Sequence, residues 1–136
     1  LTPKLNSQNI YQKNNKKTIA PIHFSKDNNS SGLSKKIIKE IKTGKFQVHS
    51  MLDLHGYRLK EAEILFFEFI QNCFTLNKRN IMVISGKREY GKGKIKLSIP
   101  VWITSTNLSS LIYFYSFAAP KDGGDGAYYI RLRKKK

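Results

Sequence analysis

The segment 51–74, MLDLHGYRLKEAEILFFEFIQNCF, joins a strand pattern directly to a helix pattern. Leu52 and Leu54 alternate with two polar residues, as in a strand that buries one face. After Gly56, apolar residues recur at helical spacing along a wide stripe over 59–77, which predicts an amphipathic helix. A strand followed closely by a helix is the first half of a βαβ unit.

The residues that follow repeat this order of strand and helix. The apolar run 80–85, NIMVIS, predicts a buried strand, and we expect a helix at about 94–105 that Pro100 kinks or ends. Two β-rich runs at 111–118 and 127–133 are separated by the turn residues KDGGDG. The order β-α-β-α-β-β predicts an α/β fold, a two-layer sandwich in which helices cover a small mixed sheet. Both βαβ units would place parallel strands side by side, and the last two strands would form a hairpin.

The N-terminal third has a different composition. Residues 1–33 are rich in Asn, Lys and Ser and show no periodicity, so we expect a flexible basic arm there. Residues 34–47 carry three isoleucines at helical spacing, which predicts a short leading helix. Residues 48–136 would then form the α/β core.

The charge of the chain indicates an anionic partner. The chain holds 25 Lys+Arg against 9 Asp+Glu, a net charge of +16. Residues 1–47 contribute ten lysines and two acids, or +8, and residues 48–136 contribute the other +8. Phosphate backbones are the commonest partners of such proteins, so we expect binding to nucleic acid. One alternative is a Lys-rich composition that only solvates the surface. An anionic membrane is a weaker alternative, because no strongly amphipathic basic helix stands out.

Composition also indicates the cellular compartment and the kinds of metal site that the chain can form. The single cysteine, Cys73, cannot form an intramolecular disulfide, and no Cys/His set has zinc spacing, so we expect no metal site of that kind. No apolar stretch predicts a membrane span or a signal peptide. These features predict a cytoplasmic protein. Oligomeric state is not set by any of these patterns.

Asp53 and His55 share the strand face opposite Leu52 and Leu54. A carboxylate beside an imidazole favours the protonated ring. Such a histidine can act as a general acid or base near neutral pH. The alternative is a histidine that only caps the strand end through ordinary hydrogen bonds, since D-x-H is frequent by chance.

Two glycine-rich segments follow strand ends. The first, 85–94 (SGKREYGKGK), presents backbone N–H groups at a helix start and surrounds them with lysines and an arginine. Its spacing is not that of a Walker loop, and a solvated turn is the alternative. The second, 121–126 (KDGGDG), has on spacing alone the character of a hairpin turn.

Taken in order, these motifs resemble a known family. They are LDLHG at 52–56, SGK at 85–87, GKIK at 93–96, PVW at 100–102, and the pattern A-P-x-x-GG-x-GA-x-Y-x-x-LR at 119–133. This is the layout of stand-alone bacterial Smr (small MutS-related) domains, and the likeness covers roughly the last three quarters of the chain. It implies an α/β sandwich similar to the C-terminal domain of translation initiation factor three. It also implies an endonuclease that nicks DNA or cleaves RNA.

The resemblance implies a catalytic pair, in which His55 is the general acid/base and Asp53 orients it. On RNA the 2′-hydroxyl would be the nucleophile and no metal would be required, whereas on DNA a water would attack, helped by a divalent ion such as Mg²⁺. The residues expected to bind nucleic acid lie in the glycine-rich segments and the last strand: Gly56, Ser85, Gly86, Lys87, Arg88, Lys92, Gly93, Lys94, Gly123, Gly124, Gly126, Arg131 and Arg133.

Two positions depart from the family pattern. Many relatives carry histidine where this chain has Ser85, and again where it has Asp122. If a second imidazole is needed for catalysis, the domain would bind structured nucleic acid or ribosomes without cutting. A third interpretation is a protein-interaction domain whose charge is incidental, because a fold does not fix a function.

Overall fold

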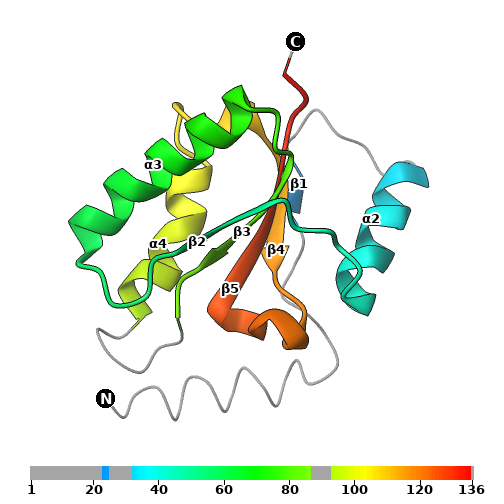
Figure 1. Cartoon of the computed structure of the whole chain (residues 1–136), viewed down its shortest axis with the longest axis horizontal. Coiled ribbons are helices and arrows are strands. Elements are labelled where there is room, and N and C mark those ends of the chain that lie inside the picture. The colour runs from blue at the N-terminus through cyan, green and yellow to red at the C-terminus, as the bar shows by residue number, and fades with distance from the viewer. Residues whose placement is uncertain (1–22, 25–31, 87–92, 136) are drawn as a thin grey trace.

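A five-stranded mixed sheet with helices on both faces forms the body of the protein (Figure 1). The structure is a computed structural model that describes residues 23–24, 32–86 and 93–135. The sheet order is β1-β4-β5-β3-β2. The elements are β1 His23–Phe24, α2 Gly32–Thr43, β2 Ser50–Asp53, α3 Leu59–Thr75, β3 Asn80–Ile84, α4 Lys94–Ile103, η2 Ser109–Leu111, β4 Ile112–Phe117, η3 Pro120–Asp122, η4 Gly124–Gly126 and β5 Ala127–Leu132.

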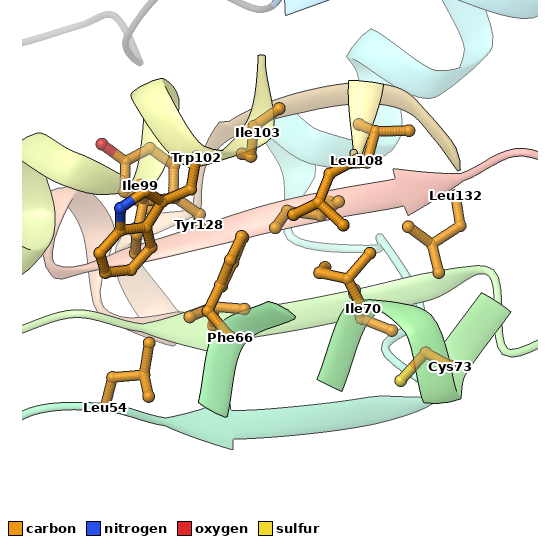
Figure 2. Close-up of a cluster of buried hydrophobic side chains, with 14 of the residues drawn as sticks. Leu54, Phe66, Ile70, Cys73, Ile99, Trp102, Ile103, Leu108, Tyr128 and Leu132 are labelled. Atoms are coloured by element: carbon orange, nitrogen blue, oxygen red, sulfur yellow. The ribbon is translucent and has the colours of Figure 1, made fainter. Parts of the chain in front are cut away.

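Helices α3 and α4 pack on one face of the sheet, and the α/β class with a mixed sheet is confirmed. Figure 2 shows the side chains of this layer, with Phe66 and Ile70 of α3 facing the strands. The Phe66 ring lies 5.4 Å from the ring of Trp102 on α4. Both helices therefore share one core with the strands beneath them. Among the described helices, none has the length and apolar character needed to cross a membrane.

Helix α2 covers part of the opposite face. The helix begins at Gly32, two residues before the expected start. Ile37 and Ile41 are buried there against Phe114 and Tyr129, and Phe46 stacks on the Tyr129 ring at 4.6 Å. The strands β4 and β5 are consequently buried between two layers of helices.

The strand order corrects one expectation. Strands β2 and β3 are parallel neighbours, as the first βαβ unit predicts. The second unit does not place β4 beside β3, because β5 lies between them and pairs antiparallel with both. The reason is burial: five of the six β5 residues are buried, including Tyr129 toward α2 and Ile130 toward α3. A strand that is apolar on both faces is most stable in the middle of the sheet.

The arm expected over residues 1–33 is described only in part. Residues 1–22 and 25–31 lie outside the described residues. His23 and Phe24 form β1, which pairs antiparallel with Tyr115 and Phe114 of β4. At least this dipeptide therefore joins the sheet.

Pro100 lies inside α4 and does not end it, so of the two expected effects, a kink or an end of the helix, the second is wrong. Proline has no N–H to donate to the carbonyl four residues earlier, which belongs to Lys96. The buried hydroxyl of Tyr128 donates to that carbonyl at 3.1 Å. The sheet thus supplies the hydrogen bond that the proline removes, and the helix continues to Ile103.

We expect Tyr128→Phe to lower the free energy of unfolding by about 1–3 kcal/mol, because the Lys96 carbonyl loses this buried donor. In a Pro100→Ala background the same change should cost less, since the alanine brings its own backbone N–H. Urea unfolding of the four proteins checks the coupling. Equal losses in both backgrounds would contradict the explanation.

Candidate active site

Asp53 and His55 lie at the carboxyl end of the edge strand β2. Leu54 between them is fully buried and Leu52 is partly buried against the core, while Asp53 and His55 are exposed, so the predicted alternation is confirmed. Asp53 Oδ1 lies 2.6 Å from His55 Nδ1 and also accepts the His55 backbone N–H at 3.1 Å. The carboxylate fixes the ring orientation through Nδ1, and the His55 side chain is 68% exposed to solvent.

The three motifs meet at one edge of the sheet. Asp53 is in register with Ile84 of β3, which is in register with Ala127 of β5. The backbone N–H groups of Ser85 and Gly86 both donate to the Gly126 carbonyl, at 2.9 and 3.0 Å. The end of β3 is thereby joined to the turn that precedes β5.

Gly86 also touches the Asp53–His55 pair. Its φ is +80°, and a Cβ built on it would lie 3.2 Å from the His55 Cβ. Glycine is needed here both for the left-handed backbone and for the close approach. The SGK and LDLHG motifs are therefore in contact through Gly86 and His55.

Ser85 and Asp122, the two residues at which the family resemblance implies histidine, are engaged in internal hydrogen bonds. The Ser85 hydroxyl donates to the carbonyls of Gly86 and Gly126, at 3.0 and 3.3 Å. Asp122 accepts a hydrogen bond from the Tyr129 hydroxyl. Burial and this hydrogen bond raise the pKa of Tyr129 to about 12, so the hydroxyl remains a donor at neutral pH. Ser85 and Asp122 thus hold the loops together and do not replace an imidazole.

A buried ion pair supports the edge from α4. Lys96 Nζ lies 2.8 Å from Asp125 Oδ2, each side chain is 9% exposed, and the ammonium lies 5.1 Å from the centre of the Phe117 ring. No periodicity or motif in the sequence predicts this pair. Two sequence features could have indicated it: a lysine among the apolar residues of α4, and an acid enclosed by glycines in GGDG. Its contact joins the first turn of α4 to the turn η4.

Of the other predicted binding residues, those that the structure describes in the glycine-rich segments lie in turns or at the start of α4. Gly93 caps α4 with a φ of +72°, and Lys94 is exposed in its first turn. Gly123 and Gly124 also have positive φ, in the turn next to Gly126. Gly56 directly follows His55 and has open space around it. Lys87, Arg88 and Lys92 lie outside the described residues.

Arg131 and Arg133 are not brought to this edge. Arg131 pairs with Asn80 at the start of β3, four residues along β5 from Ala127. At a strand rise of about 3.3 Å per residue this is about 13 Å from the edge that holds His55. Their expected role in the same loop site is therefore not supported by position.

The residues that the structure describes include no group of three or more His, Cys, Asp or Glu able to hold a metal ion. Asp53 is the single carboxylate paired with His55 within the part described. The expected role of a divalent ion in DNA cleavage is tested by comparing cleavage in magnesium with cleavage in EDTA.

We expect Gly86→Ala and Gly124→Ala to destabilise the fold by similar amounts, about 1–2 kcal/mol, because both force alanine into a left-handed conformation. Only Gly86→Ala should displace His55, since Gly124 has nothing near its added Cβ. The ring resonances of His55 in NMR spectra measure the displacement. Unchanged His55 resonances in Gly86→Ala would contradict the contact.

Lys96→Met should lower the free energy of unfolding by about 3–5 kcal/mol, because it removes the cation that lies 2.8 Å from the buried Asp125 carboxylate. The double variant Lys96→Met/Asp125→Asn should recover part of this loss, since residue 125 is then neutral as well. Urea denaturation of both variants measures the difference. A double variant less stable than Lys96→Met would contradict the pairing.

Comparison with known proteins adds family evidence to this geometry. The family model "Smr domain" matches residues 52–133. The chain is 31% identical over 96 residues to "Ribosome rescue factor SmrB" of Shewanella putrefaciens, covering 70% of this chain and 51% of the relative. It is 27% identical over 117 residues to "Probable DNA endonuclease SmrA" of Escherichia coli, covering 84% and 59%. The chain thus spans about half the length of the curated relatives it matches.

Two solved structures have a similar fold. The stand-alone small MutS-related protein YdaL of Escherichia coli superposes with a TM-score of 0.65 at 25% identity, covering 83% of this chain and 82% of that one. The Smr domain of Thermus thermophilus MutS2 superposes with a TM-score of 0.53 at 20% identity, covering 62% and 99%. The family match spans more than half of the chain and includes Asp53, His55 and the glycine-rich turns. This chain belongs to the Smr domain family.

Proposed function

We propose that this protein is an Smr-type endonuclease that binds nucleic acid through its basic surface and cuts the phosphodiester backbone beside His55. The observation that carries the proposal is the 2.6 Å hydrogen bond between Asp53 and His55 at the edge where the glycine-rich turns converge. A histidine oriented by a carboxylate and open to solvent is suited to proton transfer. Relatives named for ribosome rescue and for DNA cleavage support RNA, DNA and the ribosome as candidate partners. Such partners make the cytoplasm the proposed location.

On RNA the proposed step needs only the chain's own groups. His55 Nε2 takes the proton from a 2′-hydroxyl, and the freed oxygen attacks the adjacent phosphorus. The bond from phosphorus to the 5′-oxygen breaks, that oxygen takes a proton from water, and a cyclic phosphate remains. Asp53 stabilises the imidazolium that forms. Lys94 and the backbone N–H groups at the start of α4 favour the negative charge on the phosphate.

On DNA the nucleophile must be water, because the 2′-hydroxyl is absent. His55 would accept a proton from that water while the phosphate is held as before. A divalent ion would supply Lewis-acid stabilisation of the phosphate charge. Comparing magnesium with EDTA separates the two routes.

A second candidate function is a non-catalytic module for structured nucleic acid or ribosomes. The observation that favours it is the engagement of Ser85 and Asp122 in internal hydrogen bonds at the positions of the family's histidines. The site then holds one imidazole instead of two or three. Binding without cutting would need only the lysines, arginines and backbone amides.

We expect His55→Ala to abolish cleavage of labelled plasmid or structured RNA while changing affinity little, because phosphate contacts come from other groups. The matched control is His49→Ala, which removes another histidine at the opposite end of β2. Asp53→Asn should slow cleavage without preventing binding, since it weakens the orientation of the ring.

The cleavage assay of each variant is run with magnesium and with EDTA. Equal cleavage by His55→Ala and the parent protein would remove His55 from the mechanism. Binding without cleavage of DNA or RNA by the parent, with or without magnesium, would establish the second candidate.

A further inference from the structure

A cluster of cations occupies the end of the sheet opposite the Asp53–His55 pair. The segments 76–80 (LNKRN) and 131–135 (RLRKK) contain six lysines and arginines and no acid. They lie side by side, because the Leu132 N–H donates to the Arg79 carbonyl at 2.7 Å and Asn80 pairs with Arg131. Figure 1 shows the C-terminal segment leaving the sheet at the end away from η3 and η4. We call these two segments the far-end cluster.

Arg79 and Arg131 form the centre of the far-end cluster. Arg79 Nε donates to the Leu132 carbonyl at 3.2 Å, which holds its side chain against β5. Burial first, and then the charge of Arg131, lower the pKa of the Arg79 guanidinium. Within the described part of the chain neither arginine forms an ion pair with a carboxylate. Two half-buried cations that repel each other are stabilised when an anion binds beside them.

Buried polar atoms at the same place also lack partners. Among the described residues, Arg131 Nε and Asn80 Oδ1 are buried and make no hydrogen bond; the first is a donor that a phosphate oxygen can accept from, whereas the second is an acceptor and does not bind an anion. Asn80 is only 8% exposed. Buried polar groups without partners are uncommon in folded proteins, and each calls for an explanation. Local rules of this kind are broken mainly at functional sites.

Arg131 of the far-end cluster and Asp53 lie on the same side of the sheet. The register pairs Met51 with Met82, and Met82 packs in the α2 layer, so Asp53, two residues after Met51, lies on the α2 side. Arg131, two residues after Tyr129, lies on that side too. Arg131 lies about 13 Å from the level of Asp53 along the strands, and β5 and β2 are two strand spacings, or about 10 Å, apart across the sheet. Together these give about 16 Å, which corresponds to about five steps of a duplex, whose phosphates advance about 3.4 Å per step along the axis.

We propose that Arg79 and Arg131, surrounded by the other cations of the far-end cluster, bind a second phosphate of the nucleic acid whose scissile bond lies at His55. The cluster would set how the strand lies across the sheet, while the Asp53–His55 edge performs the chemistry. The proposal rests on the proposed function for the kind of ligand, but it does not require cleavage. Its expected contacts are sequence-independent, since they go to the backbone.

The test measures affinity against salt for labelled duplex DNA, duplex RNA and a single strand long enough to reach both ends of the sheet. Arg79→Gln/Arg131→Gln should make the log–log slope shallower by about 0.9 on duplex DNA, for one lost phosphate contact. Raising salt from about 50 to about 200 mM should then reduce the affinity of the variant about 3- to 4-fold less than that of the parent. The matched control is Lys35→Gln/Lys36→Gln, which removes the same charge from exposed positions of α2. It should change the slope less.

A second double variant tests the far-end cluster without changing its half-buried arginines, whose replacement could impair folding. Lys78→Gln/Lys134→Gln alters two exposed members of the far-end cluster and should also make the slope shallower than the control does. Circular dichroism and thermal melting confirm that each variant is folded. A slope like that of the parent, or like that of the Lys35/Lys36 control, in both far-end variants overturns the proposal.

Cleavage, which tests the proposed function, is measured separately from the salt dependence of binding, which tests the far-end cluster. His55→Ala decides whether the domain cuts, and it should keep the parent's salt slope. A protein that binds without cutting, and whose slope still depends on Arg79 and Arg131, supports the far-end cluster and rejects the endonuclease. A protein that cuts through His55 while its slope is insensitive to the cluster gives the reverse result.

Discussion

The carbonyl of Gly126 accepts hydrogen bonds from two successive N–H groups, those of Ser85 and Gly86. This joint fixes the end of β3 against the turn before β5, and Gly86 in turn lies against His55. Three segments distant in sequence are thereby set relative to one another through backbone atoms. A side chain on Gly86 would disturb the joint, so the Asp53–His55 pair depends on a position that carries no chemistry of its own.

Helix α4 strengthens this edge through a single residue. The Lys96 ammonium pairs with Asp125 while the Lys96 carbonyl accepts the Tyr128 hydroxyl. Asp125 and Tyr128 lie on either side of Gly126 in the chain, so both contacts hold the same turn. Buried ion pairs add little net stability when compared with apolar replacements, although removing one partner is costly. The value of this pair therefore lies in fixing the geometry of the turn.

Much of the fold followed from periodicity alone. The alternation around Leu52 and Leu54 predicted which side of β2 is buried, and it placed Asp53 and His55 together outside the core. The position of β5 between β3 and β4 could not be predicted from the order of elements, since a second βαβ unit and an inserted strand have the same local pattern. The ion pair of Lys96 and Asp125 was missed because it joins residues 29 positions apart. A contact between residues so far apart produces no periodic pattern in the sequence.

The central place of β5 has a consequence for synthesis of the chain. β5 follows every other described strand in the sequence, yet β3 and β4 reach each other only through it. During translation, β2, α3 and β3 can pair early, whereas β4 has no neighbour toward β3 until β5 leaves the ribosome. Folding of the sheet is thus non-local and late. The Gly126 joint belongs to the same segment, so the nascent chain acquires the geometry of the His55 edge only when the sheet closes.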